Sequence, residues 1–385
     1  MSGENRWQEA TESGQQKFHE GDFKEAYRLF SMAQAYAEHD FGSTDPRFAA
    51  SLNNLGEVYR AREEYQEAER HYRRALTIME RSLGAMHPFV VDSMLKLVEF
   101  YKGIERYGQA ELLLTKAMNM RERALGSWHS DVAELLVKLA ELHCEQKRFH
   151  EAEQLFSRAL SIREKALGSD HPEMAATLIA YANLHAARGK YTDAERVGKQ
   201  ALAIHEKALG EDDPRVADDL LWLAALESSR KAYDQAEPLL RRAVKIRETV
   251  LGKTKPETSE AVKKLACLCR YLSKDDEAAE LYRLAIAMDE ERLGTEHPAV
   301  AESLQKLAAI YNIPGKYSEA EPLYKRAVEI FEKSRGPDHP DVAECLKELG
   351  HLYTDTGKFD EAAEVEARCK TIQAHKTATP LTPAT

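Results

Sequence analysis

The sequence of 385 residues predicts an all-α fold, a right-handed α-α superhelical solenoid in which short helix pairs stack side by side. Between successive glycines, apolar residues fall at helical spacing in two stretches. In seven of eight copies a proline stands four residues after the glycine, and Ser130 takes its place in the remaining copy. A fixed period of 42 residues with a recurrent helix stop and helix start is typical of a repeat array. The glycines are Gly42, Gly84, Gly126, Gly168, Gly210, Gly252, Gly294 and Gly336.

The period that begins at Asp45 shows how one copy forms a pair of helices. Asp45 is suited to cap the first helix, and Pro46 fits its first position because the N–H that proline lacks has no partner there. The second helix is expected to begin near Gln66 and to end at the next glycine. In two later copies its start reads as a capping box, in which the hydroxyl of Thr192 or Ser318 would cap the helix.

The periods divide residues 1–376 into nine expected helix pairs, and residues 377–385 are expected to form a disordered tail because they carry few large apolar groups. The expected pairs occupy about 1–42, 43–84, 85–126, 127–168, 169–210, 211–252, 253–294, 295–336 and 337–376. Polar Ser13 and Lys17 of the first copy stand where the second copy has Leu55 and Tyr59. In the last copy, Glu366 stands where several earlier copies have an aromatic residue. The first and last pairs therefore read as caps of the array.

The order of residues within a period resembles that of the tetratricopeptide repeat. Its L-G-Y…A-F…A pattern is reproduced by Leu55, Gly56, Tyr59, Ala68, Tyr72 and Ala75. With LG-x-x-HP-x-VA joints and an LNNLGEVY first helix, residues 1 to 375 are similar to the longer repeats of kinesin light chain and its bacterial look-alikes. The resemblance implies an extended peptide in the groove, with asparagines of LNNL segments holding its backbone. Here that motif occurs once, at Leu52-Asn53-Asn54-Leu55.

Composition bounds the class of partner. The chain has 54 basic and 65 acidic residues, a net charge of -11, which argues against nucleic acid or an anionic membrane as the partner. The start lacks the layout of a secretory signal, and the five cysteines are scattered, as expected of free thiols in a reducing compartment. We therefore expect a cytoplasmic protein whose partner is a protein or peptide, and the sequence leaves its oligomeric state open.

Catalytic and metal-binding motifs are not found, so neither an enzyme nor a cofactor is predicted. An enzyme that used Cys144, His185 and Glu227 would need a base and a nucleophile placed together, and the sequence shows no such placement. One histidine recurs at most joints, where Asp45 and Asp213 stand in other copies. A single imidazole at each joint cannot build a zinc shell, so we interpret these residues as part of the helix starts. The histidines are His87, His129, His171, His297 and His339.

Binding along the first helices is the function that the sequence favours. The position of Asn53 within the 42-residue period holds an apolar residue in the next four copies: Leu95, Val137, Ile179 and Leu221. A contiguous apolar strip on a concave surface is typical of a partner site. The alternative is that these side chains tuck sideways into the neighbouring first helix.

The next phase along the helix is rich in lysine and suggests an acidic ligand. It reads Asn54, Lys96, Lys138, Ala180, Trp222, Lys264, Lys306 and Glu348. An acid stands four residues before each of these lysines, at Asp92, Glu134, Glu260 and Glu302. Such pairs are worth about 0.2 to 0.5 kcal/mol each, and a self-neutralised, solvated face explains the stripe as well.

The middle of the array departs from this pattern. Trp222 replaces the lysine, and Gly198 stands in mid-helix where other copies have an aromatic residue. An indole facing the groove would be a binding anchor. The alternative is that Trp222 fills space left by small neighbours, with Gly198 marking a flexible joint.

The sequence therefore predicts a non-catalytic interaction scaffold or adaptor that binds an extended peptide or partner segment in its concave groove. The expected groove residues are Asn53, Asn54, Leu95, Lys96, Val137, Lys138, Ile179, Leu221, Trp222, Lys264 and Lys306. The alternative is a regulatory receptor whose superhelix changes curvature when a small peptide or effector binds near Trp222.

Overall fold

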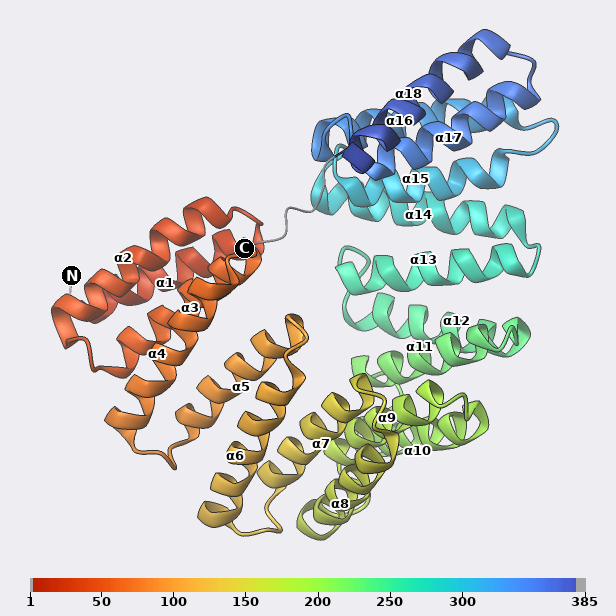
Figure 1. The fold of residues 1–385 in the computed structure, drawn as a ribbon. Helices are drawn as coiled ribbons and strands as arrows, with labels where there is room; N and C mark the ends of the chain where they lie inside the picture. The colour runs from red at the N-terminus through yellow and green to blue at the C-terminus, as the bar shows by residue number, and fades with distance from the viewer. Residues whose placement is uncertain (1–2, 379–385) are drawn as a thin grey trace. The chain divides into compact units, whose positions relative to one another are not determined.

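The computed structural model describes residues 3–378, which form helices joined by short turns, with no strand among them (Figure 1). The predicted all-α fold class is confirmed. No helix within the described residues combines the length and the apolar composition that a bilayer crossing requires. The predicted tail begins at residue 377, whereas the last helix continues to Ala378, and the rest of the tail lies outside the described residues.

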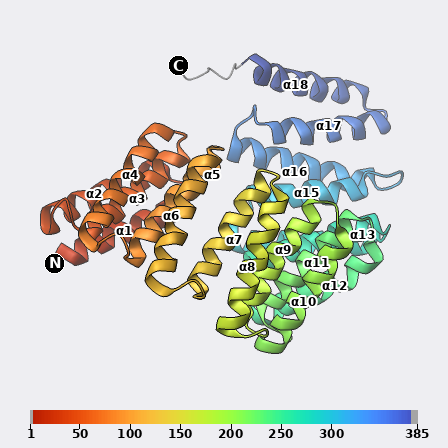
Figure 2. The same cartoon turned by 60° about the horizontal axis from the view of Figure 1, so that its bottom comes forward.

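The chain forms two compact units, Met1–Ala194 and Glu195–Thr385, which divide inside one helix, α10. Within each unit, consecutive helices pack side by side, as Figure 2 also shows. Unit 1 contains α1 (Gly3–His19), α2 (Phe23–Phe41), α3 (Pro46–Ala61), α4 (Tyr65–Leu83), α5 (Pro88–Gly103), α6 (Tyr107–Leu125), α7 (Ser130–Glu145), α8 (Phe149–Leu167) and α9 (Pro172–Ala187). Unit 2 contains most of α10 (Tyr191–Leu209), then α11 (Pro214–Ser229), α12 (Tyr233–Val250), α13 (Pro256–Tyr271), α14 (Asp275–Leu293), α15 (Pro298–Tyr311), α16 (Tyr317–Arg335), α17 (Pro340–Asp355) and α18 (Phe359–Ala378).

The joints between pairs are built as the glycine and proline pattern predicts. Gly84 takes a φ of 83°, and its N–H bonds to the carbonyl of Glu80, which ends α4. The Asp45 carboxylate then accepts a hydrogen bond from the N–H of Arg47 at 2.8 Å and caps α3. The five joint histidines do the same work through Nδ1: His87 accepts from the N–H of Phe89 at 3.2 Å, and the others repeat this distance. They are helix caps.

The predicted capping boxes of the second helices are wrong. The helices begin two residues earlier than the motif requires, at Tyr191 for α10 and at Tyr317 for α16. Thr192 and Ser318 therefore lie inside the first helical turn instead of at its cap. The residue before α16 is Lys316, whose side chain makes no capping hydrogen bond. An aromatic residue at the first helical position replaces the cap as the common feature of most second helices.

Small residues let the two helices of a pair approach closely. Ala68 and Ala75 are fully buried between α4 and its neighbours. A Cβ atom on Gly56 would lie 2.9 Å from Cε1 of Tyr72, so only glycine admits the tyrosine ring against α3. The interior beside Tyr72 continues through Phe100. Each pair thus shares its core with the next one, as expected of a stacked array.

Charged side chains tie one pair to the next at a repeated position of the second helix. Glu69 pairs with Arg73 at 2.8 Å on its own helix and with Arg106 of the following turn at 2.9 Å. Glu321 repeats this arrangement with Lys325 at 2.7 Å and Lys358 at 2.6 Å. In α18 this position holds Ala363, and the nearby Glu366 is exposed and pairs with Lys370 at 3.9 Å on its own helix. This polar surface on α18 agrees with its interpretation as a cap.

Candidate binding site

The first helices carry the predicted groove residues. The exposed side of α3, α5, α7 and α9 in unit 1 is called the first-helix face. Asn53 and Asn54 lie on α3, Leu95 and Lys96 on α5, Val137 and Lys138 on α7, and Ile179 on α9. In unit 2, Leu221 and Trp222 lie on α11, Lys264 on α13 and Lys306 on α15.

The apolar strip is less open than the sequence suggested. Leu95, Val137 and Leu221 are half-buried and pack against the cores of their own units. Ile179 is half-buried as well. The sideways-packed alternative therefore accounts for much of each side chain, and only the remaining exposed fraction can meet a partner.

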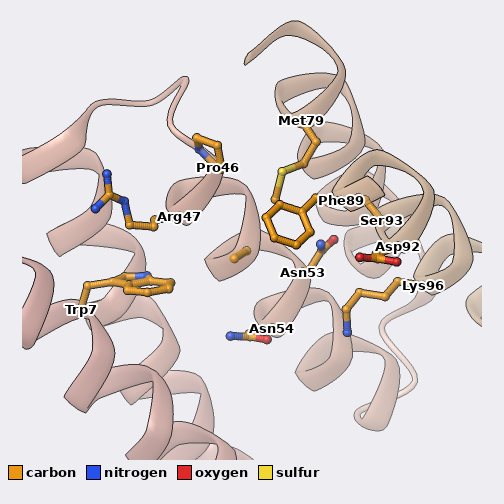
Figure 3. A pocket seen from close by; sticks show the side chains of 11 residues that line it. Trp7, Pro46, Arg47, Asn53, Asn54, Met79, Phe89, Asp92, Ser93 and Lys96 are labelled. Carbon is orange, nitrogen blue, oxygen red and sulfur yellow. The ribbon is translucent and has the colours of Figure 1, made fainter. Parts of the chain in front are cut away.

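The structure brings three of the predicted residues, Asn53, Asn54 and Lys96, together around one cavity of about 330 Å³ (Figure 3). We call this cavity the Asn53 pocket. It opens between α1, α3 and α5, with the end of α4 contributing one residue. Figure 3 shows Trp7 on one side and Met79 with Phe89 on the other. The complete lining is Trp7, Pro46, Arg47, Ala50, Asn53, Asn54, Met79, Phe89, Asp92, Ser93 and Lys96.

Two polar groups of the Asn53 pocket are buried without a hydrogen-bond partner. Asn53 is 5% exposed and Ser93 is 2% exposed, and neither Asn53 Oδ1 nor Ser93 Oγ is bonded within the described part of the chain. Leaving a buried polar atom unpaired costs about 1–3 kcal/mol. The equivalent hydroxyl one period earlier, that of Ser51, has a partner: the indole N–H of Trp7 donates to Ser51 Oγ at 2.9 Å. The Asn53 pocket therefore offers acceptors to an incoming donor.

Charges at the rim of the pocket differ in how firmly they are held. Arg47 bonds to Asp45 through Nε at 2.9 Å and lies over the ring of Phe41, 3.5 Å from its centroid. These hydrogen bonds from Arg47 hold the pKa of Asp45 below its usual value. Asp92 and Lys96 are exposed, and neither forms an ion pair with any described residue. They are therefore free to meet a charged ligand.

The predicted acid–lysine ladder is correct in two copies and wrong in two. Glu134 lies 4.0 Å from Lys138, and Glu260 lies 3.5 Å from Lys264. Asp92 does not reach Lys96, and Glu302 pairs with Arg335 at 2.8 Å instead of with Lys306. Exposed i,i+4 pairs are weak enough for Arg335, at the end of the following helix α16, to take the place of Lys306.

In unit 2, Trp222 does not stand free in a groove. A Cβ atom on Gly198 would come within 2.4 Å of Cζ3 of Trp222, so the half-buried indole lies against the α10 backbone. This packing explains Gly198 without a flexible joint. Leu221 and Lys264 line a separate cavity of about 270 Å³ between α11 and α13, which also contains the exposed Cys267 and Tyr271.

The residues of the enzyme alternative are not arranged for catalysis. Burial raises the pKa of the Cys144 thiol to about 11, so the nucleophilic thiolate is scarce at neutral pH. His185 packs on the ring of Tyr181, with centroids 4.5 Å apart, and makes no hydrogen bond to Cys144 within the described residues. Glu227 is buried and pairs with Arg230 at 3.3 Å. Each of the three is explained by local packing.

Six segments of the chain match the tetratricopeptide repeat family model: residues 8–80, 47–123, 131–207, 215–291, 285–333 and 299–373. Together they span far more than half of the sequence. The chain is a tetratricopeptide repeat protein. The predicted membership is confirmed, and the helix pairs described above are its repeats. A search of curated proteins by sequence found no match.

Solved structures show the same tetratricopeptide fold. Repeats of a putative kinesin light chain from Podosopora anserina are 26% identical, cover 54% of this chain and 99% of their own, and give a TM-score of 0.49. BtubC (BKLC) from P. vanneervenii is 21% identical over 62% of this chain and 95% of its own, with a TM-score of 0.52. A STAND ATPase with a tetratricopeptide repeat sensor from Pyrococcus horikoshii is 14% identical, covers 91% of this chain and 52% of its own, and gives a TM-score of 0.59.

The tetratricopeptide pattern could not reveal the Asn53 pocket in full. Trp7 and Met79 were missed because they lie on α1 and α4, outside the first helices of the predicted strip, and Phe89 and Ser93 were missed because they stand at other positions of α5 than Leu95 and Lys96. One signal was present in the sequence. Met79 occupies the position at which Arg121, Arg163 and Arg247 recur in later copies.

Proposed function

We propose that this tetratricopeptide repeat protein is a non-catalytic scaffold or adaptor that binds an extended segment of a partner protein along the first-helix face of unit 1. The observation that carries the proposal is the Asn53 pocket. It combines apolar walls with two buried acceptors that lack partners, Asn53 Oδ1 and Ser93 Oγ. Ligand sites of proteins have this composition, with few polar groups set in an apolar cavity.

The mechanism is passive. A side chain of the segment enters the pocket and buries apolar surface against Trp7 and Phe89. Asn54, half-buried beside the pocket, is placed to bond the backbone of the segment, as the resemblance to kinesin light chain repeats implies. The half-buried Leu95 and Val137 continue the apolar surface along α5 and α7. No covalent step is involved.

The charge of the chain and its cysteines support a protein partner in the cytoplasm. A net charge of -11 disfavours nucleic acid and anionic lipid, and the cysteines of the described residues are free thiols. The curvature-change alternative relied on Gly198 as a flexible joint. The packing of Trp222 against α10 explains this glycine instead.

The proposal is tested by selecting binders from a display library of short random peptides on the full chain and measuring their affinity by fluorescence anisotropy. The decisive variant is Asn53→Leu with Asn54→Lys, which gives α3 the residues that α5 carries at these positions, Leu95 and Lys96. We expect this variant to fold and to lose about tenfold or more in affinity.

The matched control is Arg70→Ala, on the exposed side of α4 and away from the first-helix face. It should bind selected peptides as the wild type does. Failure of the library to yield any binder, or binding that survives the double substitution on α3, would overturn the proposed function.

A further inference from the structure

One position of the second helices shows which chemistry the Asn53 pocket is built to receive. At intervals of 42 residues this position holds Ala37, Met79, Arg121, Arg163, His205, Arg247, Asp289 and Phe331. It lies near the end of each second helix and faces the first helix that follows. In three of these copies it presents a guanidinium, whereas Met79 presents a thioether, which donates no hydrogen bond.

Arg163 shows what the guanidinium does where it is present. Its Nη1 donates to the carbonyl oxygen of Glu173 at 2.7 Å and to Thr177 Oγ1, both on α9. Arg163 is 7% exposed, so this contact lies in the interior of unit 1. In unit 2, Arg247 donates in the same way to the carbonyl oxygen of Glu257 at 2.6 Å and to Asp218 Oδ1 at 2.6 Å.

The acceptors of Arg163 have counterparts in the Asn53 pocket. Thr177 and Glu173 stand two periods after Ser93 and Phe89, so Ser93 Oγ occupies the place of the hydroxyl that Arg163 satisfies. Ser93 Oγ has no hydrogen-bond partner among the described residues, and Met79 supplies no donor to it. Asn53 adds an acceptor that the copy of Arg163 lacks, since Val137 stands at its position there.

We propose that the Asn53 pocket receives an arginine side chain of the bound segment, whose guanidinium donates to Asn53 Oδ1 and Ser93 Oγ and faces the Asp92 carboxylate. The inference rests on the proposed peptide-binding function and names the side chain that the pocket selects. The partner's arginine thus takes the role that Arg163 plays within the chain. Its methylene stem lies along Met79, and Trp7 and Phe89 offer ring faces to the cation.

Several acceptors in one cavity favour guanidinium over other donors. An indole carries one N–H, as Trp7 shows by satisfying Ser51 alone, and it would leave either Asn53 or Ser93 unpaired. Guanidinium carries five donors in a fixed fork and also matches the free carboxylate of Asp92. Lys96 at the rim opposes the cation, so its removal should strengthen binding.

The chain supplies its own competitor for the test. Met79→Arg should place a guanidinium in the pocket as Arg163 does at its own joint, and it should lower the affinity of arginine-containing selected peptides by about tenfold or more. Met79→Leu is the matched control and should bind normally, because it keeps the apolar wall without adding a donor. Asp92→Asn should weaken the same peptides, and Lys96→Gln should strengthen them.

The peptides provide the second half of the test. Replacing arginine by norleucine keeps the stem and should cost about tenfold or more, and replacement by tryptophan should not restore affinity. Peptides that bind the first-helix face without any dependence on arginine or on Met79→Arg would overturn the inference and leave the proposed function standing.

If the library yields no binder, the proposed function is overturned. A second measurement then tests the arginine site by itself. N-acetylarginine N-methylamide is titrated into the full chain with its methionine methyl groups labelled for NMR. A selective shift of the Met79 methyl, absent with the norleucine analogue and in Asp92→Asn, supports an arginine site. An unchanged Met79 methyl overturns it.

Discussion

Trp222 and Gly198 show how a single residue's surroundings decide between two interpretations of a sequence. From the sequence alone an exposed indole in the groove and a space-filling indole are equally consistent with the pattern. The structure places the indole against α10, at a point where any Cβ would collide with it. The residual exposure of Trp222 leaves its part in binding a prediction, whereas its part in packing is direct.

Replacing Gly198 by alanine should lower the free energy of unfolding by about 1 kcal/mol or more, because overpacking costs more than the helix preference of alanine returns. Urea denaturation measures the change. Gly108 provides the control, since its Cβ would meet no atom within 4 Å and Gly108→Ala should be neutral or stabilising. Equal effects of the two substitutions would contradict the packing argument, and adding Trp222→Leu to Gly198→Ala should restore stability.

At the same scale, the sequence predicted part of the candidate site. Asn53, Asn54 and Lys96 stand at two adjacent positions of the 42-residue period, and this periodicity alone predicts that they lie on the first-helix face. The walls of the pocket come from α1 and α4 as well, and no periodic rule says that Trp7 and Met79 line opposite sides of one cavity. The missing donor at Ser93 is visible only when the buried hydrogen bonds of each joint are compared.

At the scale of the element, the glycine and proline pattern predicted the helix bounds closely, because these residues act on the backbone directly. Gly84 ends α4 and Pro46 begins α3, as expected. The start of the second helices was predicted one residue late. Before α4 the turn is held by the left-handed Glu63, with a φ of 62°, and no side chain caps the helix.

The burial of His185 on α9 gives the protein a predictable response to acid. Burial holds its pKa below the usual value, so the unfolded chain takes up this proton at a higher pH than the folded chain does. Its contribution to stability is complete above the unfolded pKa of about 6.5 and is lost as the pH falls through that value toward the folded pKa.

We therefore expect His185→Tyr, which adopts the residue found at this position in α3 and α15, to lose less stability on acidification than the wild type. Urea midpoints measured near neutral pH and at about pH 5.5 make the comparison. His19→Gln, at an exposed site on α1, is the control and should respond to pH as the wild type does. Parallel pH dependence in the wild type and His185→Tyr would refute the assignment.

At the scale of the whole molecule, stability is distributed along the array because each helix pair packs on its neighbours in the chain. The interior beside Tyr72 ends within unit 1, and unit 2 has a core of its own around Tyr324 and Phe331. A fault in one repeat should therefore remain local.

Gly56→Val tests this locality, because its side chain would collide with the ring of Tyr72 between α3 and α4. Hydrogen exchange read by mass spectrometry should show lost protection from α3 to α6 and unchanged protection from α14 to α17. A uniform loss across both units would mean that the array unfolds as one cooperative body.

The glycines that end the second helices all adopt nearly the same backbone geometry, with φ between 83° and 93° from Gly42 to Gly336. A crossover between two such genes at any of these codons joins chain ends that already point the same way. Whole 42-residue cassettes are thus interchangeable at the joints, so recognition surfaces can be shuffled or lengthened by recombination without redesigning a single turn.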